Sequence, residues 1–466
     1  MDKKYDYIVI GSGPAGHISA ITAAKLGLRA AIIEKDLGMM GGVCLNEGCI
    51  PAKSLYASAH LFGAVKDLAG TIGTWPHPNE ALSEMIVKST VASETLKRGL
   101  LSHLRKLGVD ILEASAEFED RSRLTITAPQ GKKTRVGAEK ILIATGSVPR
   151  SLDTIPFDGQ SVISSSQAIK LSTVPENILI IGAGAIGVEF ASFFSTMGSS
   201  VTLVESETEI LHAEDRDVSA SMRNMLKKMG VKVFTSAAVG PVTGKRGKVF
   251  AITSQKADGT VEGEYDIVLV SVGRIPSTSD LKIARTGIIP DDKGYIPVNG
   301  EMQTNIKGLY AAGDVVPGPM LAHVAQAEGE LAAFSAAGRA AKPLDYSSIP
   351  NAVYSCVQAA SVGFTEKQAA EAGRDVIAGK SFFKANGKAV AVGEYDGFVK
   401  IIADAKTHII LGAHIVGHLA TEIINEFAIA RRLALTVDDI AGTVHAHPTF
   451  SESASSAAKD IIFKKL

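Results

Sequence analysis

The sequence predicts an α/β chain in which two related parallel-sheet domains are followed by a separate α+β domain. Its 466 residues are enough for about three domains. Many of its 45 glycines come directly after short β-branched runs, which is typical of strands that end at ligand-binding turns. The chain also repeats itself, because the run from Tyr7 to Gly16 resembles the run from Ile178 to Gly187.

Composition and charge exclude several classes of protein. Hydrophobic residues make up 46% of the chain, which is enough to build cores and excludes disorder as the main state. With 48 Lys and Arg against 49 Asp and Glu, the chain lacks the basic footprint of a nucleic-acid binder. No apolar run reaches a membrane span, and no signal peptide fits before the strand that begins at Tyr5. We therefore expect a soluble, cytoplasmic protein that binds neither nucleic acid nor membrane.

The first predicted element is a strand that ends in the pattern G-x-G-x-x-G, formed by Gly11, Gly13 and Gly16, and leads into an Ala-rich helix. Glycines at this turn allow the backbone to approach a pyrophosphate, to which the helix N-terminus offers free N–H groups. Glu34, 23 positions after Gly11, closes the next apolar run and can accept a hydrogen bond from a ribose hydroxyl. The alternative is that these glycines only allow tight packing of strand and helix.

The second copy has the same spacing. Gly182, Gly184 and Gly187 form its glycine pattern, and Glu205 again follows the first glycine by 23 positions. One G-x-G-x-x-G is a weak signal, but two copies in register, each with its acid, favour two Rossmann-like domains. The repeat therefore predicts binding of two adenine dinucleotides.

The remaining elements define the domain boundaries. The runs Ile141–Gly146 and Val268–Gly273 read as the closing strands of the two copies, and helical stretches lie around residues 50–108. We predict domains at residues 1–147 and 148–275. A central segment at 276–345 carries a strand before Gly313 and an Ala-rich helix near 322–340, and a C-terminal domain at 346–466 has strands at Phe398 and Ile409.

Two of the three cysteines, Cys44 and Cys49, lie close together among glycines. In a regular helix their Cα atoms would be roughly 8–9 Å apart, beyond the ~7 Å limit for a disulfide. A bridge therefore requires an irregular turn, which Gly48 could supply. The polar neighbours Asn46 and Glu47 favour a redox-active pair over buried structural thiols, whereas Cys356 reads as an interior or interface residue.

A second candidate reactive group lies near the C-terminus. Pro448 favours an extended His447 and the start of a helix, and Glu452 follows early enough to fold back and hold the imidazole. His447 could be catalytic, could be a structural histidine, or could bind a metal together with His445. Because no cysteine or third histidine lies nearby in the sequence, we predict no metal site.

Taken together, these segments resemble the flavoprotein disulfide reductases, and the resemblance spans essentially the whole chain. The stretch from Gly41 to Lys53 and the stretch from His445 to Glu452 are most similar to those of the dihydrolipoamide dehydrogenases. The resemblance implies that FAD binds the first glycine pattern and NAD the second, and that the C-terminal domain forms a homodimer. The chain departs from the common pattern at Val43, Glu47, Val357 and Gln358.

The resemblance also implies roles for individual residues. Cys49 would lie against the flavin as the charge-transfer thiol, and Cys44 would exchange with a dithiol substrate. His447, oriented by Glu452, would take a proton from the dithiol at the cysteines of the other subunit. Further cofactor-binding residues are implied besides the two glycine patterns and their acids. Lys53 would pair with Glu189, and Asp314 would lie near the ribityl chain or pyrophosphate of FAD. The others are Ala116, Thr145, Gly146, Gly273, Arg274, Gly313 and Ala322.

The activity implied is transfer of two electrons from a protein-bound dihydrolipoyl group through the cysteines and FAD to NAD⁺. The implied partners are the lipoyl-bearing acyltransferase or H-protein of 2-oxoacid dehydrogenase or glycine-cleavage complexes. A reductase of glutathione-like disulfides usually has basic residues where this chain has Glu205-Ser206-Glu207, and a Hg(II) reductase has a C-terminal cysteine pair. A flavin-containing subunit without turnover is a further alternative, which the intact set of Cys, Lys, His and Glu disfavours.

Overall fold

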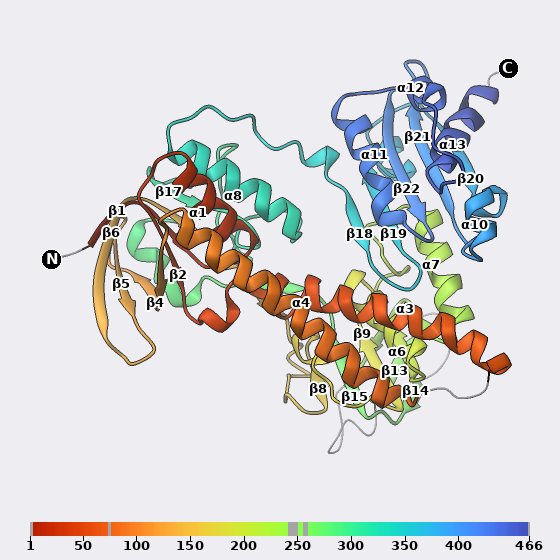
Figure 1. The fold of residues 1–466 in the computed structure, drawn as a ribbon, viewed down its shortest axis with the longest axis horizontal. Coiled ribbons are helices and arrows are strands. Elements are labelled where there is room, and N and C mark those ends of the chain that lie inside the picture. The colour runs from red at the N-terminus through yellow and green to blue at the C-terminus, as the bar shows by residue number, and fades with distance from the viewer. Residues whose placement is uncertain (1–2, 73–75, 241–249, 255–259, 465–466) are drawn as a thin grey trace. The chain divides into compact units, whose positions relative to one another are not determined.

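A computed structural model describes residues 3–72, 76–240, 250–254 and 260–464, shown as a ribbon in Figure 1. The chain divides into two compact units, one of residues 1–55, 84–150 and 273–344, the other of residues 56–83, 151–272 and 345–466. Helix α3 (Cys49–Ile72) therefore begins in the first unit and ends in the second. The sequence had placed all residues up to 147 in one domain, whereas residues 56–83 cluster with the second unit.

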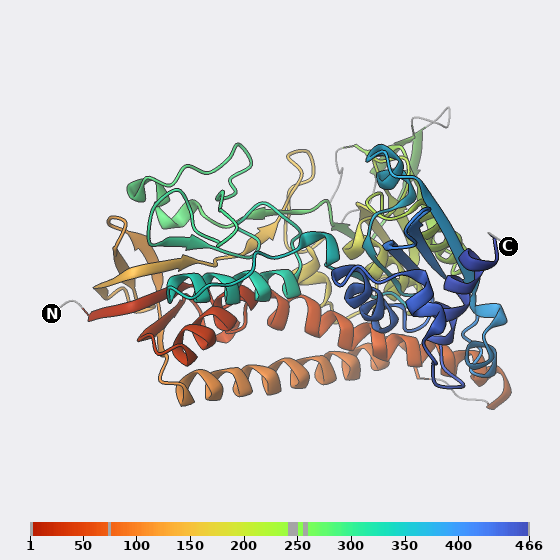
Figure 2. The ribbon, with the colours of Figure 1, turned by 90° about the horizontal axis from the view of Figure 1, so that it is seen from above.

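The first unit is built on a sheet with the glycine-pattern strand at its centre. Its parallel strands run in the order β3 (Asp110–Glu113), β2 (Ala30–Glu34), β1 (Lys3–Ile10), β6 (Lys133–Ile143) and β17 (Leu309–Ala311). Because both faces of the sheet are covered, the second half of β1, from Tyr7 to Ile10, is a continuous apolar run. Helices α1 (Pro14–Lys25) and α8 (Ala322–Ala336) pack side by side against one face (Figures 1 and 2). The other face packs against β4 (Ser115–Phe118) and β5 (Arg123–Thr127), which continue from β6 as an antiparallel meander.

The second unit repeats this order of strands. Its parallel sheet runs β11 (Lys232–Phe234), β10 (Ser200–Val204), β9 (Asn177–Ile181), β15 (Ile267–Val270) and β8 (Val162–Ile163). Helix α6 (Ala185–Thr196) follows β9 as α1 follows β1. Strands β12 (Ala237–Val239), β13 (Phe250–Ser254) and β14 (Thr260–Gly263) form a second antiparallel meander. The internal repeat predicted from the sequence is therefore confirmed, because four strands run in the same order in both sheets. The fifth strand differs, since β17 follows β6 in the chain whereas β8 precedes β9.

The C-terminal part of the second unit is an antiparallel sheet covered by helices. Its strands run in the order β18 (Asn351–Val353), β19 (Ala359–Gly363), β22 (Ile410–Val416), β21 (Phe398–Asp404) and β20 (Val376–Phe382). Helices α11 (Ala420–Arg432), α12 (Val437–Gly442) and α13 (Glu452–Phe463) share a buried core with these strands. The predicted α+β character of this region is confirmed.

The remaining elements connect these layers. The helical stretch expected around residues 50–108 is divided between α3 and α4 (Pro78–Lys106), and Trp75 between them lies outside the described residues. Helix α7 (Arg216–Lys228) lies in the second unit. The short elements are α2 (Gly42–Asn46), α5 (Ser165–Ala168), α9 (Glu366–Glu371), α10 (Gly387–Ala391), β7 (Ser147–Pro149), β16 (Arg274–Pro276) and the 3₁₀ turns at Leu37–Met39, Ser279–Leu281, Ile283–Thr286, Tyr346–Ser348 and Phe383–Ala385.

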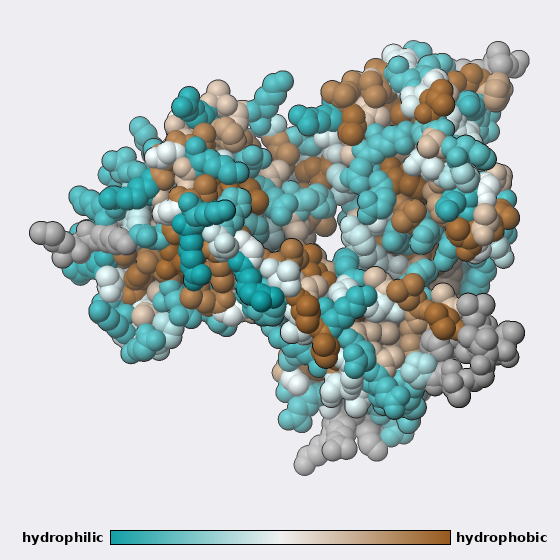
Figure 3. Space-filling model, viewed as in Figure 1, coloured by the Kyte–Doolittle hydropathy of each residue, from teal (hydrophilic) through white to brown (hydrophobic). Residues whose placement is uncertain are grey.

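The visible surface of each unit is mostly hydrophilic, with hydrophobic side chains in scattered patches (Figure 3). Within the described part of the chain, none of the helices combines the length and the apolar character that crossing a membrane requires.

Candidate functional site

The first glycine pattern has two tightly packed positions and one open position. Gly11 has a φ of +98°, and a Cβ atom built on it would lie 2.3 Å from the carbonyl oxygen of Ala144. A Cβ atom on Gly16 would lie 1.9 Å from the carbonyl oxygen of Gly11, whereas a Cβ atom on Gly13 would meet nothing within 4 Å. Packing therefore explains Gly11 and Gly16 but not Gly13. The space at Gly13, at the N-terminus of α1, fits the approach of a pyrophosphate.

The second glycine pattern has the same geometry. Gly182 has a φ of +96°, and its Cβ atom would lie 2.6 Å from the carbonyl oxygen of Ser271. A Cβ atom on Gly187 would lie 1.9 Å from the carbonyl oxygen of Gly182, and one on Gly184 would again meet nothing within 4 Å. Each unit thus leaves the middle glycine open in front of a helix N-terminus, which is the arrangement that a dinucleotide site requires.

The two acids that follow the glycine patterns are fixed in equivalent positions. Oε2 of Glu34 accepts hydrogen bonds from the backbone N–H of Ser12 (3.0 Å) and from its hydroxyl (2.7 Å). Oε2 of Glu205 accepts from the backbone N–H of Ala183 at 2.6 Å, and its Oε1 accepts from that of Glu207 at 2.9 Å. Because a carboxylate offers about four acceptor positions, each acid can still accept a ribose hydroxyl.

The cysteine pair lies at an irregular turn, as the spacing of the two cysteines requires for a disulfide. Helix α2 ends at Asn46, and α3 begins at Cys49. A Cβ atom on Gly48 would lie 2.9 Å from the carbonyl oxygen of Val43 and 3.2 Å from the Cα atom of Cys44. The turn therefore excludes a side chain at Gly48 and brings the start of α3 against Cys44.

The two thiols are close enough to interact, and both side chains are half-buried. A hydrogen bond to Cys49 and burial raise the pKa of Cys44, while the charge of Lys53 opposes this rise. The raised pKa favours the protonated form of Cys44 beside Cys49.

The segment that leads into the cysteine turn contacts the first glycine pattern. The backbone N–H of Gly41 donates to the hydroxyl of Ser12 at 3.1 Å. A Cβ atom on Gly42 would lie 2.6 Å from the Cα atom of Gly13. The cysteine segment thus packs directly against the open glycine, so a dinucleotide bound at Gly13 would lie beside the turn that carries the cysteines.

Several predicted cofactor residues meet in the first unit. The Ser147 hydroxyl donates to Oδ2 of Asp314, and Nε of Arg274 donates to the same hydroxyl at 2.7 Å. Burial lowers the pKa of Arg274, whose charge acts on Asp314 and on Cys49. Sequence analysis missed Ser147, because its partners follow it by 127 and 167 positions.

The other predicted residues of this unit lie at turns and strand ends. Gly313 has a φ of +76°, and its N–H donates to the buried carboxylate of Glu328 at 2.7 Å. Glu328, a charged residue within the Ala-rich helix α8, is a second residue that sequence analysis missed. Thr145 donates to the carbonyl oxygen of Ser277 at 2.6 Å. Gly146 and Gly273 have positive φ angles, and Ala322 is the first residue of α8. Ala116 lies in β4, with its side chain buried in the core.

The histidine near the C-terminus is oriented by the expected carboxylate. His447 Nδ1 and Glu452 Oε1 are 2.9 Å apart, and Glu452 Oε2 accepts from the backbone N–H of Thr449 at 2.8 Å. The hydrogen bond from Thr449 lowers the pKa of Glu452 most, and the contact with His447 lowers it further. The helix begins at Glu452 and not at Pro448 as predicted, because residues 447–451 form a turn closed by this carboxylate. The His447 side chain is 76% exposed, and so is open to a reactant.

Two further predicted relationships concern His445 and Glu189. His445 pairs with Glu426 at 3.0 Å. Glu189 is buried on α6 and accepts from the backbone N–H of Tyr354 at 2.8 Å. Because Lys53 belongs to the first unit and Glu189 to the second, their pairing stays a prediction.

Comparison with known proteins agrees with this geometry. The Pyridine nucleotide-disulphide oxidoreductase family model matches residues 5–329, and the dimerisation domain of the same family matches residues 349–458. A dihydrolipoyl dehydrogenase from Chlorobaculum tepidum is 37% identical over 98% of this chain and 97% of its own length. A mitochondrial dihydrolipoyl dehydrogenase from Pisum sativum is 38% identical over 97% of this chain and 90% of its own length. The solved structure of LpdA from Mycobacterium tuberculosis, 27% identical, covers 97% of this chain and 99% of its own with a TM-score of 0.87.

These matches cover both units and the C-terminal sheet. FAD and NAD, the cofactors expected from the two glycine patterns, are those of the matched enzymes. The match to the dimerisation domain supports the expected homodimer. Because both family models match and together cover most of its length, the chain belongs to the pyridine nucleotide-disulphide oxidoreductase family.

Proposed function

We propose that this protein oxidises protein-bound dihydrolipoyl groups and reduces NAD⁺, using Cys44, Cys49 and FAD. The observation that carries the proposal is the cysteine turn, in which Gly48 brings two interacting thiols together beside Gly13, the open position of the first glycine pattern. The substrate is inferred from the dihydrolipoyl dehydrogenases, to which the chain is similar along almost its whole length.

The reaction begins with thiol–disulfide exchange. A thiolate of the dihydrolipoyl group attacks Sγ of Cys44 in the oxidised pair, the Cys44–Cys49 bond breaks, and Cys49 leaves as a thiolate. The positive charge of Arg274 acts on Cys49 and stabilises this leaving group. The second lipoyl thiol then attacks the lipoyl sulfur attached to Cys44, which closes the lipoyl disulfide and releases Cys44.

His447 is the proposed base for this step. It takes the proton of the second lipoyl thiol and returns one to the Cys44 sulfur as that sulfur leaves. Glu452 stays ionised because its pKa is lowered, so it fixes the Nδ1 side of the ring and leaves Nε2 for the substrate. The dithiol has then lost two electrons to the cysteine pair, and bound FAD would supply the hydride chemistry that links this pair to NAD⁺.

We place Lys53, Asp314, Arg274, Thr145 and the first glycine pattern at the flavin, with Ala116, Gly146, Gly273, Gly313 and Ala322 contributing backbone to that site. The second glycine pattern, Glu189 and Glu205 belong to the NAD⁺ site in this proposal. As partners we propose the lipoyl-bearing acyltransferase or H-protein of a multienzyme complex, with His447 acting on the cysteines of the other subunit of the homodimer.

The roles of the two thiols are tested by the order in which they are alkylated. After anaerobic reduction of the holoenzyme by NADH, we expect iodoacetamide to label Cys44 first, because flavin covers Cys49. Since the pKa of Cys44 is raised above the ordinary 9.0, its labelling rate should still increase with pH above that value. Peptide mapping that finds Cys49 labelled first would reverse the two roles.

A further inference from the structure

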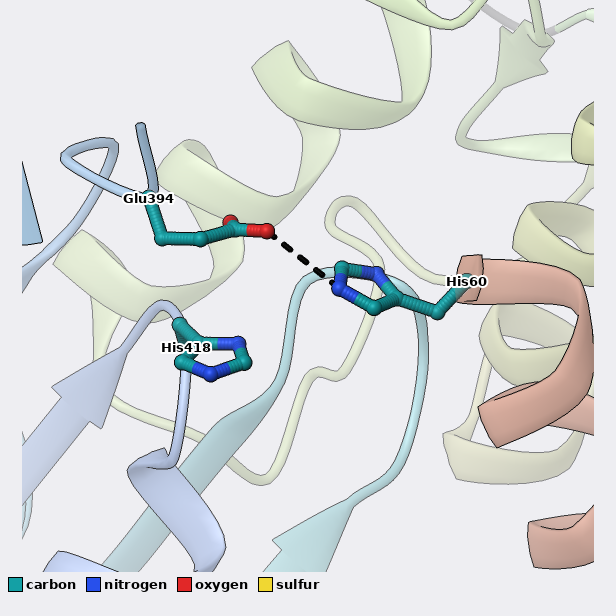
Figure 4. A group of neighbouring side chains, drawn as sticks. All are labelled: His60, Glu394 and His418. Atoms are coloured by element: carbon teal, nitrogen blue, oxygen red, sulfur yellow. Dashed lines mark ion pairs between the residues drawn. The ribbon is translucent and has the colours of Figure 1, made fainter. Parts of the chain in front are cut away.

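We infer that His60, Glu394 and His418 form a binding site for Zn²⁺ in the second unit. His60 lies at the middle of α3, Glu394 between α10 and β21, and His418 between β22 and α11. Figure 4 shows the three side chains pointing toward one another from these separate segments. The proposed flavin, NAD⁺ and dithiol chemistry uses none of them.

The donor set and its spacing suit this ion. The ligand atoms of the three residues all lie within 4.8 Å of one another, and Nε2 of His60 is 3.2 Å from Oε1 of Glu394. Zinc binds imidazole nitrogen and carboxylate oxygen at about 2.0–2.2 Å, commonly through two histidines and one glutamate with a fourth position open. The side chains of His60 and Glu394 are 32% and 36% exposed, so they can move inward and an ion can reach them.

A fourth residue orients the proposed ligand His60. Its ring is hydrogen-bonded to the sulfur of Cys356 as well as to Glu394. Cys356 is fixed in turn by Thr196, whose hydroxyl lies 3.3 Å from the sulfur, and by Ser192, which accepts from its backbone N–H at 3.0 Å. Histidine ligands usually have such a partner at the other ring nitrogen, which sets the ring orientation. This gives Cys356 a function that its sequence position did not suggest.

A second group of acids in the same unit does not qualify. Asp215, Asp217 and Glu366 also place their oxygens close together. The ammonium group of Lys400 already lies among them, at 2.7, 2.9 and 2.8 Å. This internal cation neutralises the acids, whereas Glu394 in the histidine cluster is paired with His60, itself a proposed ligand.

The test measures Zn²⁺ binding to the FAD-loaded full chain in its oxidised state, since the Cys44–Cys49 disulfide then cannot bind the metal. We expect one Zn²⁺ per chain by calorimetry. His60→Gln, Glu394→Gln and His418→Gln should each weaken binding at least about tenfold, as loss of a ligand requires. His408→Gln, a histidine of the same unit paired with Asp438, is the matched control and should bind as the wild type does.

Co²⁺ replaces Zn²⁺ to identify the ligands. The wild type should give the absorption of a nitrogen and oxygen site, and Cys356→Ser should bind Co²⁺ about tenfold more weakly with the same spectrum. Equal affinity in the wild type and the three ligand variants would overturn the proposal, and a sulfur-to-cobalt band would overturn the ligand set. Thermal unfolding without metal identifies any variant that fails to fold. If a histidine variant does, the affinity of Glu394→Gln, whose side chain is only half-buried, decides.

Discussion

His447 owes its proposed role to two neighbours that leave one side of its ring open. Glu452 fixes Nδ1, and the backbone N–H of Thr449 fixes Glu452. Asn386 donates to the carbonyl oxygen of Thr449 at 2.9 Å and to the hydroxyl of Ser453 at 3.1 Å, which anchors this turn to the start of α13. The imidazole is thus exposed but held in one orientation, as a general base must be.

His447→Gln should lower NAD⁺ reduction by dihydrolipoamide by about 10²–10⁴-fold, because loss of a general base typically costs that much. Oxidation of NADH by ferricyanide should be nearly unchanged, since it needs no base at the thiols. Both rates are measured on the FAD-loaded variant. His445→Gln is the control, because His445 pairs with Glu426; if this variant were the one that lost dithiol turnover, the base would be His445.

At the residue scale, the sequence predicted groups that are close along the chain. The pairs Cys44 and Cys49, and His447 and Glu452, lie five positions apart, so local backbone geometry is enough to bring them together. Ser147 and Glu328 could not be predicted in the same way, because their contacts with Asp314 and Gly313 depend on how distant strands and helices pack.

The strand–turn–helix element is used twice with the same division of roles among its glycines. In each copy the first and third glycines are required by backbone contacts shorter than any Cβ atom allows, while the middle glycine has open space. The sequence could predict the motif but not this division, because the spacing G-x-G-x-x-G is the same whether a glycine serves packing or ligand approach.

Gly184→Ala and Gly187→Ala should therefore have different effects. The Gly184 variant should fold normally but raise the KM for NAD⁺, because its methyl group enters the space in front of α6. The Gly187 variant should lose about 1–3 kcal/mol of unfolding free energy through overpacking, since its Cβ atom would lie 1.9 Å from a carbonyl oxygen. Urea unfolding and NAD⁺ kinetics separate the two effects. The reverse pattern would show that Gly184 is the packing residue.

The end of β10 should determine the choice of nicotinamide cofactor. Glu205 is fixed beside the second glycine turn by the N–H groups of Ala183 and Glu207, where it can accept from ribose hydroxyls but repels a 2′-phosphate. NAD⁺ should be preferred over NADP⁺ at least about a hundredfold in kcat/KM.

A double variant checks this placement. Glu205→Ala combined with Glu207→Arg should narrow the preference for NAD⁺, because it removes the repulsive carboxylate and adds a cation. Comparable turnover of the wild type with both cofactors would contradict the placement of Glu205.

At the scale of the whole molecule, the chain is two units built around related sheets, with the C-terminal sheet in the second unit. The sequence predicted this duplication because strand ends, glycines and acids recur at equal spacing. It did not predict that α3 begins in one unit and ends in the other, because the periodicity of a long helix does not show which core each of its turns joins. The proposed activity needs both units, since the cysteines lie in one and His447 in the other.

The most direct test of the proposed function is steady-state NADH formation by the FAD-loaded protein with free dihydrolipoamide, beside the same assay with reduced glutathione. We expect turnover with dihydrolipoamide to exceed that with glutathione at least about a hundredfold in kcat/KM, and to disappear in Cys44→Ser and Cys49→Ser. Equal or faster turnover with glutathione, or no NADH from dihydrolipoamide, would contradict the proposed function.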